Sequence, residues 1–301
     1  MHRSGIAPTV AAATVAIILT GCSSGGSANK SSGSNLTAGA AANSPLHSAL
    51  PADVQKSGSL TMATDATIGA PFASFGSDNK SVVGLNVDVA QALGQVMGVQ
   101  VKIVNTPFGT FIPGLQAKRY DFSVSVMLDT KKREKVVDFV DYIKDGSGFL
   151  VRAADTHTSL GLADLCGVRA AAISGSVEQQ DLATQSTKCT SAGKKPVAIS
   201  IFPENAQGIL ALTSSRVDVW VGDSDQNAWL KQQNNGTVTQ SGVPFDAAID
   251  GIAVLKGNPI VPVLQKATQM LMDNGTYSRI LTKYGVQNSA ISPATLNNAQ
   301  Y

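Results

Sequence analysis

Residues 85–104 read LNVDVAQALGQVMGVQVKIV, and this stretch decides the fold because two hydrophobic periods follow each other within it. Asn86 can cap a helix, and Gly98 can end that helix in the left-handed conformation that glycine adopts easily. From Val99 to Val104 the apolar residues alternate, which is typical of a strand. The apolar face of the predicted helix consists of Val89, Leu93, Val96 and Met97.

The alternation of strand and helix continues on both sides of this stretch. We predict a strand over Ser59–Thr64, a helix over Phe111–Lys118 and a further strand over Phe122–Val126. The order is then βαβαβ. Because strands that are joined through helices pair in parallel, we expect an α/β fold with a parallel sheet and covering helices.

A second α/β unit follows. Ser176–Gln179 has the pattern of a capping box at the start of a helix. Two α/β units of similar size indicate two lobes with a ligand cleft between them. The remaining expected elements are short helices at Leu162–Leu165 and Asn205–Leu212, strands at Val168–Ile173, Val197–Ile201, Val217–Val221 and Gly251–Leu255, and helices at Val261–Met272 and Tyr277–Lys283, separated by Asn274-Gly275.

The N-terminal region has the layout of a secretory signal. Arg3 precedes an apolar run from Val10 to Leu19, which is too short for the roughly 20 residues of a membrane-spanning helix. The run ends in Leu19-Thr20-Gly21-Cys22, which resembles a bacterial lipobox, so we expect residues 1–22 to be a lipoprotein signal and Cys22 to be acylated. An ordinary signal that contains a cysteine is the alternative. Residues 23–50 are rich in Ser, Gly, Ala and Asn, and we expect a disordered tether.

Composition narrows the classes of partner. The chain has 23 Lys and Arg against 21 Asp and Glu, a net charge of +2, and no basic run with interleaved aromatic residues. A nucleic-acid partner is therefore not expected. Beyond Cys22 the only cysteines are Cys166 and Cys189, an even pair in an exported domain, which indicates one disulfide, with two free thiols as the alternative.

Histidine usage argues against several kinds of active site. His157 is the only histidine beyond residue 50, and its polar neighbours Asp155 and Thr158 indicate a surface loop. Sites of the Ser-His-Asp, Cys-His or His/Cys zinc type need more imidazoles or thiols than this chain offers. We therefore expect no catalytic residue, no metal and no cofactor.

Several short blocks occur along the chain in a fixed order. They are Ser59–Thr67 with Pro71-Phe72, Val83–Ala90, Pro113–Gln116 with Tyr120-Asp121, Asp129–Arg133 running to Val137-Asp138-Phe139, Leu165-Cys166-Gly167, Gly175-Ser176, Arg216-Val217-Asp218 with Asp223, and Asp273–Tyr277. Over residues 57–288 these blocks resemble family 3 extracellular solute-binding proteins, the amino-acid receptors of ABC importers. The cysteine-containing second lobe resembles members from Gram-positive actinobacteria in particular.

The resemblance implies a two-lobe, periplasmic-binding-protein-like clamp of type II. Lobe 1 would comprise residues 51–147 and 248–301, and lobe 2 residues 148–247, with crossovers near Gly146–Leu150 and Phe245–Asp250. Such a clamp closes on its solute by hinge motion, and the closed form is recognised by the transporter. We therefore expect a monomer on the extracellular face of the cell membrane, with an ABC permease as its partner.

The resemblance also assigns ligand-binding residues. Arg133 matches the arginine that pairs with the ligand α-carboxylate, because a guanidinium binds a carboxylate through two parallel hydrogen bonds. Ser176 and the Val177 amide match the second-lobe group that meets the same carboxylate at a helix start. Asp223 matches the carboxylate that holds the α-ammonium group. Asp65 matches a reader of the ligand side chain, Phe108 a residue that packs over the ligand, and Ser125 a main-chain acceptor for the ammonium group.

Three positions depart from the family pattern. Leu128 occupies a position where a Ser or Thr usually donates to the carboxylate, Ile68-Gly69 replaces an aromatic residue, and Val126 replaces a second Ser. From these changes we expect a more apolar pocket that takes a smaller or less polar amino acid rather than histidine, lysine or arginine. A non-amino-acid solute, a sensor for a membrane kinase, and an enzyme resembling cyclohexadienyl dehydratases, with Asp65, Glu178 or Asp223 as its acid, remain alternatives.

Overall fold

The computed structural model describes residues 44–155, 159–234 and 236–300. The predicted signal, Cys22, His157 and most of the predicted tether lie outside these residues. Within them, the helices are all too short or too polar to cross a membrane.

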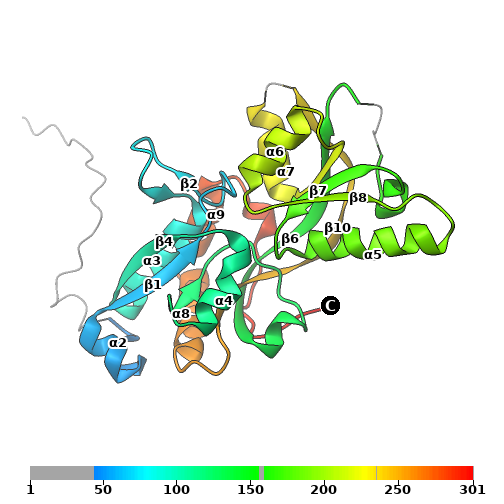
Figure 1. Ribbon diagram of the computed structural model, residues 1–301. Helices are drawn as coiled ribbons and strands as arrows, with labels where there is room; N and C mark the ends of the chain where they lie inside the picture. Colours follow the sequence, from blue (N-terminus) through cyan, green and yellow to red (C-terminus); the bar gives the residue numbers. More distant parts are fainter. Residues whose placement is uncertain (1–43, 156–158, 235, 301) are drawn as a thin grey trace, which may run out of the picture. The chain divides into compact units, whose positions relative to one another are not determined.

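The first part of the chain has the predicted βαβαβ order (Figure 1). β1 (Ser59–Thr64) pairs in parallel with both β4 (Gln100–Asn105) and β5 (Phe122–Ser123), which confirms the parallel arrangement. The connecting helices are α3 (Leu85–Met97) and α4 (Phe111–Gln116). Smaller elements are α2 (Ala52–Ser57), η2 (Phe108–Thr110), and the strands β2 (Ser74–Phe75) and β3 (Val82–Val83), which pair with each other.

Helix α3 ends as predicted but begins differently. Gly98 has a φ of 69° and caps the C-terminus in the left-handed conformation. The N-cap is Gly84, with a φ of 133°, and not Asn86. Asn86 is buried, and its Nδ2 donates to Thr64 Oγ1 at 3.2 Å. The asparagine therefore ties α3 to β1 instead of capping the helix.

The end of the predicted tether is folded. Leu46 and Leu50 are only 2% and 4% exposed, and the turn η1 (His47–Ala49) lies between them. These leucines pack in the main hydrophobic core, whose burial offsets the entropy of ordering this segment. The prediction of disorder up to residue 50 is therefore wrong for residues 44–50.

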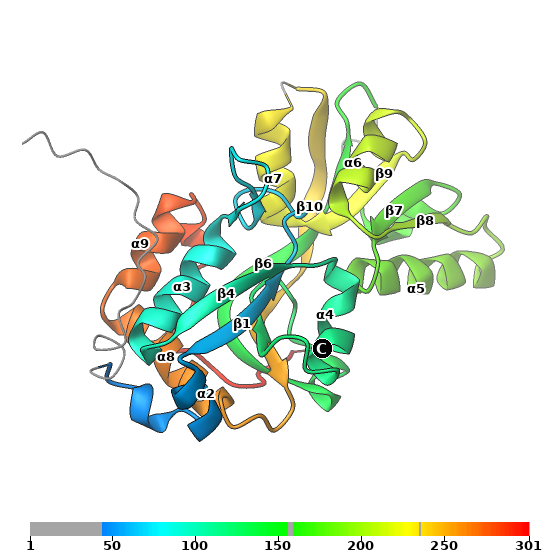
Figure 2. The same cartoon turned by 60° about the vertical axis from the view of Figure 1, so that its left-hand side comes forward.

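Two long antiparallel strands were largely missed: β6 (Val137–Arg152) was not predicted at all, and only Gly251–Leu255 of β10 (Val238–Leu255) was predicted. β6 pairs with β10 from Arg152↔Val238 to Val137↔Leu255. The pairing register shifts at three places between Ser241 and Gly251, as β-bulges do where a strand bends. Both expected crossovers, near 146–150 and 245–250, lie within these strands, which join the two halves of one eight-stranded sheet with the order β4-β1-β5-β10-β6-β9-β7-β8 (Figure 2).

The second lobe is built on the far end of this sheet. β7 (Arg169–Ile173) pairs in parallel with β8 (Ala198–Phe202) and β9 (Val219–Asp223), and β9 pairs antiparallel with β6. The helical elements are η4 (Leu162–Leu165), α5 (Val177–Ser191), α6 (Asn205–Thr213) and α7 (Ser224–Gln233). Helix α7 begins directly after β9 and was not predicted. A disulfide joins Cys166 and Cys189, as predicted. A separate core, from Phe149 to Val221, lies inside this lobe. The exact lobe bounds stay a prediction.

The C-terminal part returns to the first lobe. Helices α8 (Val261–Asp273) and α9 (Thr276–Lys283) pack against α3, and η5 (Gln287–Ser289) follows. The tail then runs along β6, with single bridges Ile143↔Ala290 and Val140↔Leu296. β10 and this tail place late segments of the chain beside early ones.

Candidate functional site: a cleft between the lobes

One cleft collects side chains from both lobes and from the two long strands. Six of the eight predicted ligand-binding residues line it: Phe108, Leu128, Arg133, Ser176, Val177 and Asp223. Ile68 and Val126, two of the three departures from the family pattern, line it as well. The residues predicted to bind the ligand's α-carboxylate and those predicted to bind its α-ammonium group therefore line the same cleft.

Asp65 and Ser125 are not among the residues that line the cleft. Asp65 is 1% exposed; its Oδ1 accepts from the Thr67 amide at 2.8 Å and the Thr67 hydroxyl at 2.7 Å, and its Oδ2 accepts from the Phe108 amide at 2.9 Å. Burial raises the pKa of Asp65 while these hydrogen bonds lower it. Asp65 thus holds the turn that carries Phe108. Ser125 is fully buried, and its carbonyl accepts from the Met127 amide, which places it behind Val126.

Arg133 lies in the 3-10 turn η3 (Arg133–Lys135) and is 7% exposed. Its two terminal nitrogens donate to main-chain carbonyls from both lobes, Nη1 to Leu128 at 2.7 Å and Nη2 to Gly175 at 3.0 Å. The guanidinium carbon lies 5.8 Å from the ring centre of Phe108. Burial lowers the pKa of Arg133, and the neighbouring Glu178 and Asp250 oppose this effect. Arginine keeps its charge in proteins, so the cleft contains a fixed cation.

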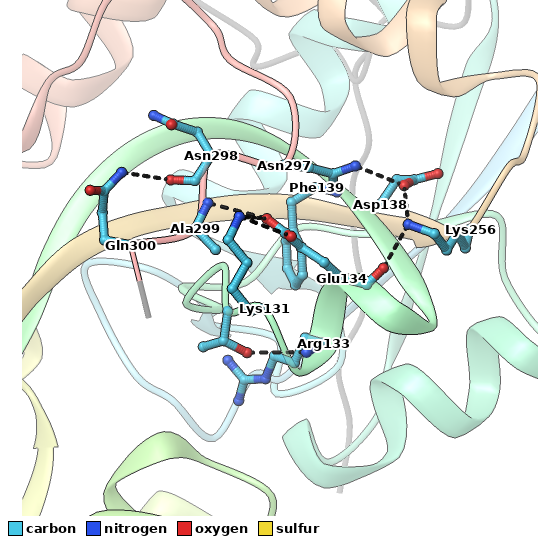
Figure 3. A network of polar contacts seen from close by, with 11 residues as sticks. Lys131, Arg133, Glu134, Asp138, Phe139, Lys256, Asn297, Asn298, Ala299 and Gln300 are labelled. Carbon is cyan, nitrogen blue, oxygen red and sulfur yellow. Dashed lines mark hydrogen bonds and ion pairs between the residues drawn. The ribbon is translucent and has the colours of Figure 1, made fainter.

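A network of polar contacts fastens the turn that carries Arg133 (Figure 3). The Arg133 amide donates to Thr130 Oγ1 at 3.2 Å. Glu134 Oε1 accepts from Lys131 Nζ and from the Ala299 amide, both at 3.2 Å. Lys256 Nζ donates to the Glu134 carbonyl at 2.7 Å and pairs with Asp138, which also accepts from Asn297 Nδ2 at 2.9 Å. The C-terminal tail therefore holds η3, and with it Arg133, in place.

The start of α5 forms the facing wall of the cleft. Ser176 is the N-cap, and its Oγ accepts from the Gln179 amide at 3.2 Å, as predicted. The reciprocal bond of the box differs, because Gln179 Oε1 accepts from the Gly175 amide at 2.7 Å rather than from that of Ser176. Glu178, in the first turn, is 5% exposed and accepts from Ser147 Oγ at 2.6 Å. A helix start presents free amide donors to an anion, while Glu178 adds an acceptor beside them.

Asp223, the last residue of β9, is another of the predicted ligand-binding residues that line the cleft. Burial, with the neighbouring Glu178 and Asp145, raises its pKa well above the ordinary value of an aspartate. An ammonium group beside Asp223 would favour the ionised carboxylate, because an opposite charge favours the charged form.

Sequence reasoning missed most of the acidic lining. Asp145, Asp246 and Asp250 line the cleft from β6 and β10. Asp145 Oδ1 accepts from Ser224 Oγ at 2.6 Å and from the Gly146 amide at 2.7 Å, and burial together with Asp225 raises its pKa to about 7. Asp246 and Asp250 lie about a hundred positions after Asp145, and no local motif marks the three aspartates. Predicting them would have required the β6–β10 pairing.

A two-lobed α/β fold with a buried arginine, a helix start and aspartates in one cleft is the architecture of a solute receptor. The chain belongs to the bacterial extracellular solute-binding proteins, family 3, whose sequence pattern matches residues 60–287. Members of this family work outside the cytoplasm, and the curated relatives are amino-acid-binding proteins of ABC transporters rather than enzymes.

Individual relatives agree with this assignment. The arginine-binding protein ArgT of Corynebacterium glutamicum is 28% identical over 228 residues, which cover 75% of this chain and 74% of that protein. The structure of an ancestral arginine-binding protein bound to glutamine is 31% identical, with a TM-score of 0.68, and the match covers 76% of this chain and 98% of that one. An ancestral amino acid-binding protein, a precursor of cyclohexadienyl dehydratase, has the same TM-score at 28% identity, covering 77% of this chain and 97% of that one.

Proposed function

We propose that this protein is the lipid-anchored solute receptor of an ABC importer and that it binds an amino acid in the cleft. The observation that carries the proposal is the convergence of Arg133, the start of α5 and Asp223 on one cleft. This is the arrangement that an α-amino acid requires, with one anionic and one cationic group on neighbouring atoms. We propose no catalytic step.

The ligand α-carboxylate would bind to Arg133 and to the start of α5. A guanidinium has five N–H donors, and two of those of Arg133 are directed to the carbonyls of Leu128 and Gly175. The remaining donors are available to a carboxylate, and the free amides and the dipole of α5 favour negative charge at the same point. Asp223 would hold the α-ammonium group.

Closure of the lobes would bury the ligand. Contacts that join the two lobes include Arg133 Nη2 to the Gly175 carbonyl at 3.0 Å and Lys132 Nζ to Gln180 Oε1 at 2.9 Å. We infer that these contacts belong to the closed form, and that β6 and β10 bend when the lobes open. The permease would recognise this form of a monomeric receptor.

We also revise the expected ligand. The sequence favoured a small or less polar amino acid, because Leu128 and Ile68 replace polar or aromatic residues. The cleft, however, is lined by five carboxylates, those of Asp145, Glu178, Asp223, Asp246 and Asp250, against the single guanidinium of Arg133. This charge balance, together with relatives named for arginine, supports an amino acid with a cationic side chain.

The proposal is tested by isothermal titration of the purified protein with the twenty amino acids. We expect saturable binding of one or a few amino acids, and loss of that binding in Arg133→Ala. Lys135→Ala is the matched control, since it removes a neighbouring exposed cation of η3 that does not line the cleft. Binding of no amino acid, or undiminished binding by Arg133→Ala, would refute the proposed function.

Membrane anchoring is tested separately. We propose that Cys22 is acylated, so a radioactive fatty acid should label the wild-type protein in its native host and should not label Cys22→Ser. Equal labelling of both proteins would exclude Cys22 as the anchor.

A further inference from the structure

Asp250 has a property that the proposed roles of Arg133 and Asp223 leave unexplained. It lines the cleft, is only 3% exposed, and its Oδ2 has no hydrogen-bond partner among the described residues. Other cleft carboxylates are partly satisfied, Asp145 by Ser224 and Gly146, and Glu178 by Ser147. Because buried polar groups are nearly always hydrogen-bonded, an unpaired carboxylate in a binding cleft indicates a partner that arrives with the ligand.

The position of Asp250 is fixed by main-chain pairing. The segment 127–129 bridges to β10 on both sides of Asp250, through the Asp129 amide to the Ile249 carbonyl at 2.9 Å and the Gly251 amide to the Met127 carbonyl at 3.0 Å. Leu128 and Asp250 are therefore direct neighbours. Asp250 therefore stands on the same main-chain framework as the loop that leads to Arg133, and both residues line the cleft.

Arg133 is not the missing partner. None of the ion pairs within 4.0 Å among the described residues involves Arg133. Its guanidinium donates to the carbonyls of Leu128 and Gly175 instead. Arg133 lowers the pKa of Asp250 only against the larger effects of burial and of Asp145, which raise it well above the ordinary value. The surroundings of Asp250 are therefore short of positive charge.

Asp223 and Asp250 stand at separate points of the sheet. Along β6, Asp223 lies opposite Ser147 and Asp250 lies opposite Ile143. Four residues of an extended strand span roughly 13 Å. This span separates the main-chain positions of the two residues, while their carboxyl groups still interact electrostatically. An amino acid with a long cationic side chain carries two separated positive groups, one for each carboxylate.

We propose that Asp250 is the residue that selects a second positive charge on the ligand, in place of Asp65. This inference rests on the proposed function, since it assumes an amino acid held by Arg133 and Asp223. Asp65 already accepts hydrogen bonds from Thr67 and Phe108 on its two oxygens, and it does not line the cleft. Asp250, by contrast, gains a partner when a cationic side chain enters.

The test compares L-arginine with citrulline, its neutral analogue of nearly the same shape, by isothermal titration. We expect the wild-type protein to prefer arginine. Asp250→Asn should weaken arginine binding by about 30-fold or more, because truncating one partner of a buried charge pair has effects of this size, and should leave citrulline binding within about threefold. Asp181→Asn, the same substitution in a neighbouring pocket that is not the cleft, is the control and should change neither ligand by more than about threefold.

The possible results separate the two proposals. If the wild-type protein binds amino acids but does not prefer arginine, or if Asp250→Asn retains the wild-type preference, Asp250 is not the selecting residue and the receptor function stands. If the wild-type protein binds no amino acid, the proposed function fails first. Loss of arginine preference in Asp65→Asn alone would return the role to Asp65.

A second measurement does not depend on any variant being folded. The titratable and charged groups around Asp250 are Asp145 and Tyr142 of β6, Glu178 of α5, Asp223 of β9, Asp225 of α7 and Arg133 of η3, so carboxylates outnumber the cation. Binding of a cation should therefore release protons, and arginine affinity should rise between pH 5.5 and pH 7.5 while citrulline affinity changes less. Titration in two buffers of different ionisation enthalpy measures this release. Proton uptake, or no exchange, on arginine binding would overturn the inference.

Discussion

Substituting Gly109 with alanine is the most direct way to separate lobe closure from folding. Gly109 lies in the 3-10 turn η2, outside the left-handed region, so alanine fits its backbone conformation. A Cβ at this position would lie 2.9 Å from the Ser174 carbonyl oxygen and 3.4 Å from its carbon. Ser174 belongs to the second lobe, just before Gly175, where a Cβ would in turn lie 3.1 Å from Gly109 Cα. The two lobes therefore meet here backbone to backbone.

The magnitude follows from the contact. A carbon 2.9 Å from a carbonyl oxygen requires one of the two backbones to shift, and overpacking of this kind costs roughly 1–3 kcal/mol. Under the proposed lobe closure, only the closed form has this contact, so the whole penalty would fall on ligand binding. Since 1.4 kcal/mol is tenfold in an equilibrium constant, the dissociation constant should rise by about 5- to 150-fold.

The assay is isothermal titration of Gly109→Ala with the amino acid that binds the wild-type protein, together with urea unfolding of the ligand-free protein. We expect weaker binding and a free energy of unfolding that is unchanged within about 0.5 kcal/mol. Gly161→Ala is the control, because its Cβ would meet only Asp164 Oδ2 at an ordinary 3.6 Å. Unchanged affinity in Gly109→Ala would show that the ligand-bound form lacks this contact and would refute the assignment of closure to it.

Three further predictions concern stability, the carboxylate anchor and pH. Replacing Cys166 and Cys189 together with serine should lower the free energy of unfolding by about 3 kcal/mol, because the crosslink spans 23 residues; urea unfolding measures the loss, and an unchanged midpoint would contradict it. Arg133→Lys should weaken ligand binding by roughly 30-fold or more in titrations, since a lysine lacks the two-pronged donor, and wild-type affinity would show that the charge alone suffices. Burial raises the pKa of Asp129 and of Asp145 to about 7 from 3.8, so between these pH values the folded protein binds more protons than the unfolded chain. Thermal unfolding of the ligand-free protein should therefore show stability falling as pH rises from about 5 to 8, and Asp145→Asn should flatten that trend. Stability that rises with pH over this range would contradict the raised pKa values.

The local sequence pattern was sufficient to predict those helices and strands whose hydrophobic period or capping residues mark them. The helix and strand of residues 85–105, with Gly98 between them, follow from hydrophobic period and glycine conformation, and the structure confirms them within a residue or two. The start of α5 at Ser176 follows from capping chemistry in the same way. Arg133 was predicted through the family motif, because the spacing of that motif is visible in the sequence alone.

The rest depends on pairing between distant segments. β6 contains Asp138, Asp141 and Asp145, which interrupt the apolar alternation of a strand, and its partner β10 begins 86 positions after β6 ends. Neither strand is recognisable until the other is in place. Asp250 is therefore invisible as a site residue in the sequence, because its environment is supplied by a strand and a loop more than a hundred positions earlier. Asp65 is the opposite case, because it stands at a motif position that the sequence displays, while in the structure its oxygens accept from Thr67 and Phe108.

The order in which the chain is made gives the C-terminal tail a further consequence. β10 inserts between β5 and β6, and the tail then fastens Glu134 and Asp138 beside Arg133. A nascent polypeptide that has emerged only as far as residue 230 has the residues of η3 and of the second lobe, yet it has neither Asp250 nor the tail that holds Arg133. Ligand recognition is therefore acquired late during synthesis, and a partly emerged chain should be unable to sequester an amino acid before the whole cleft can form.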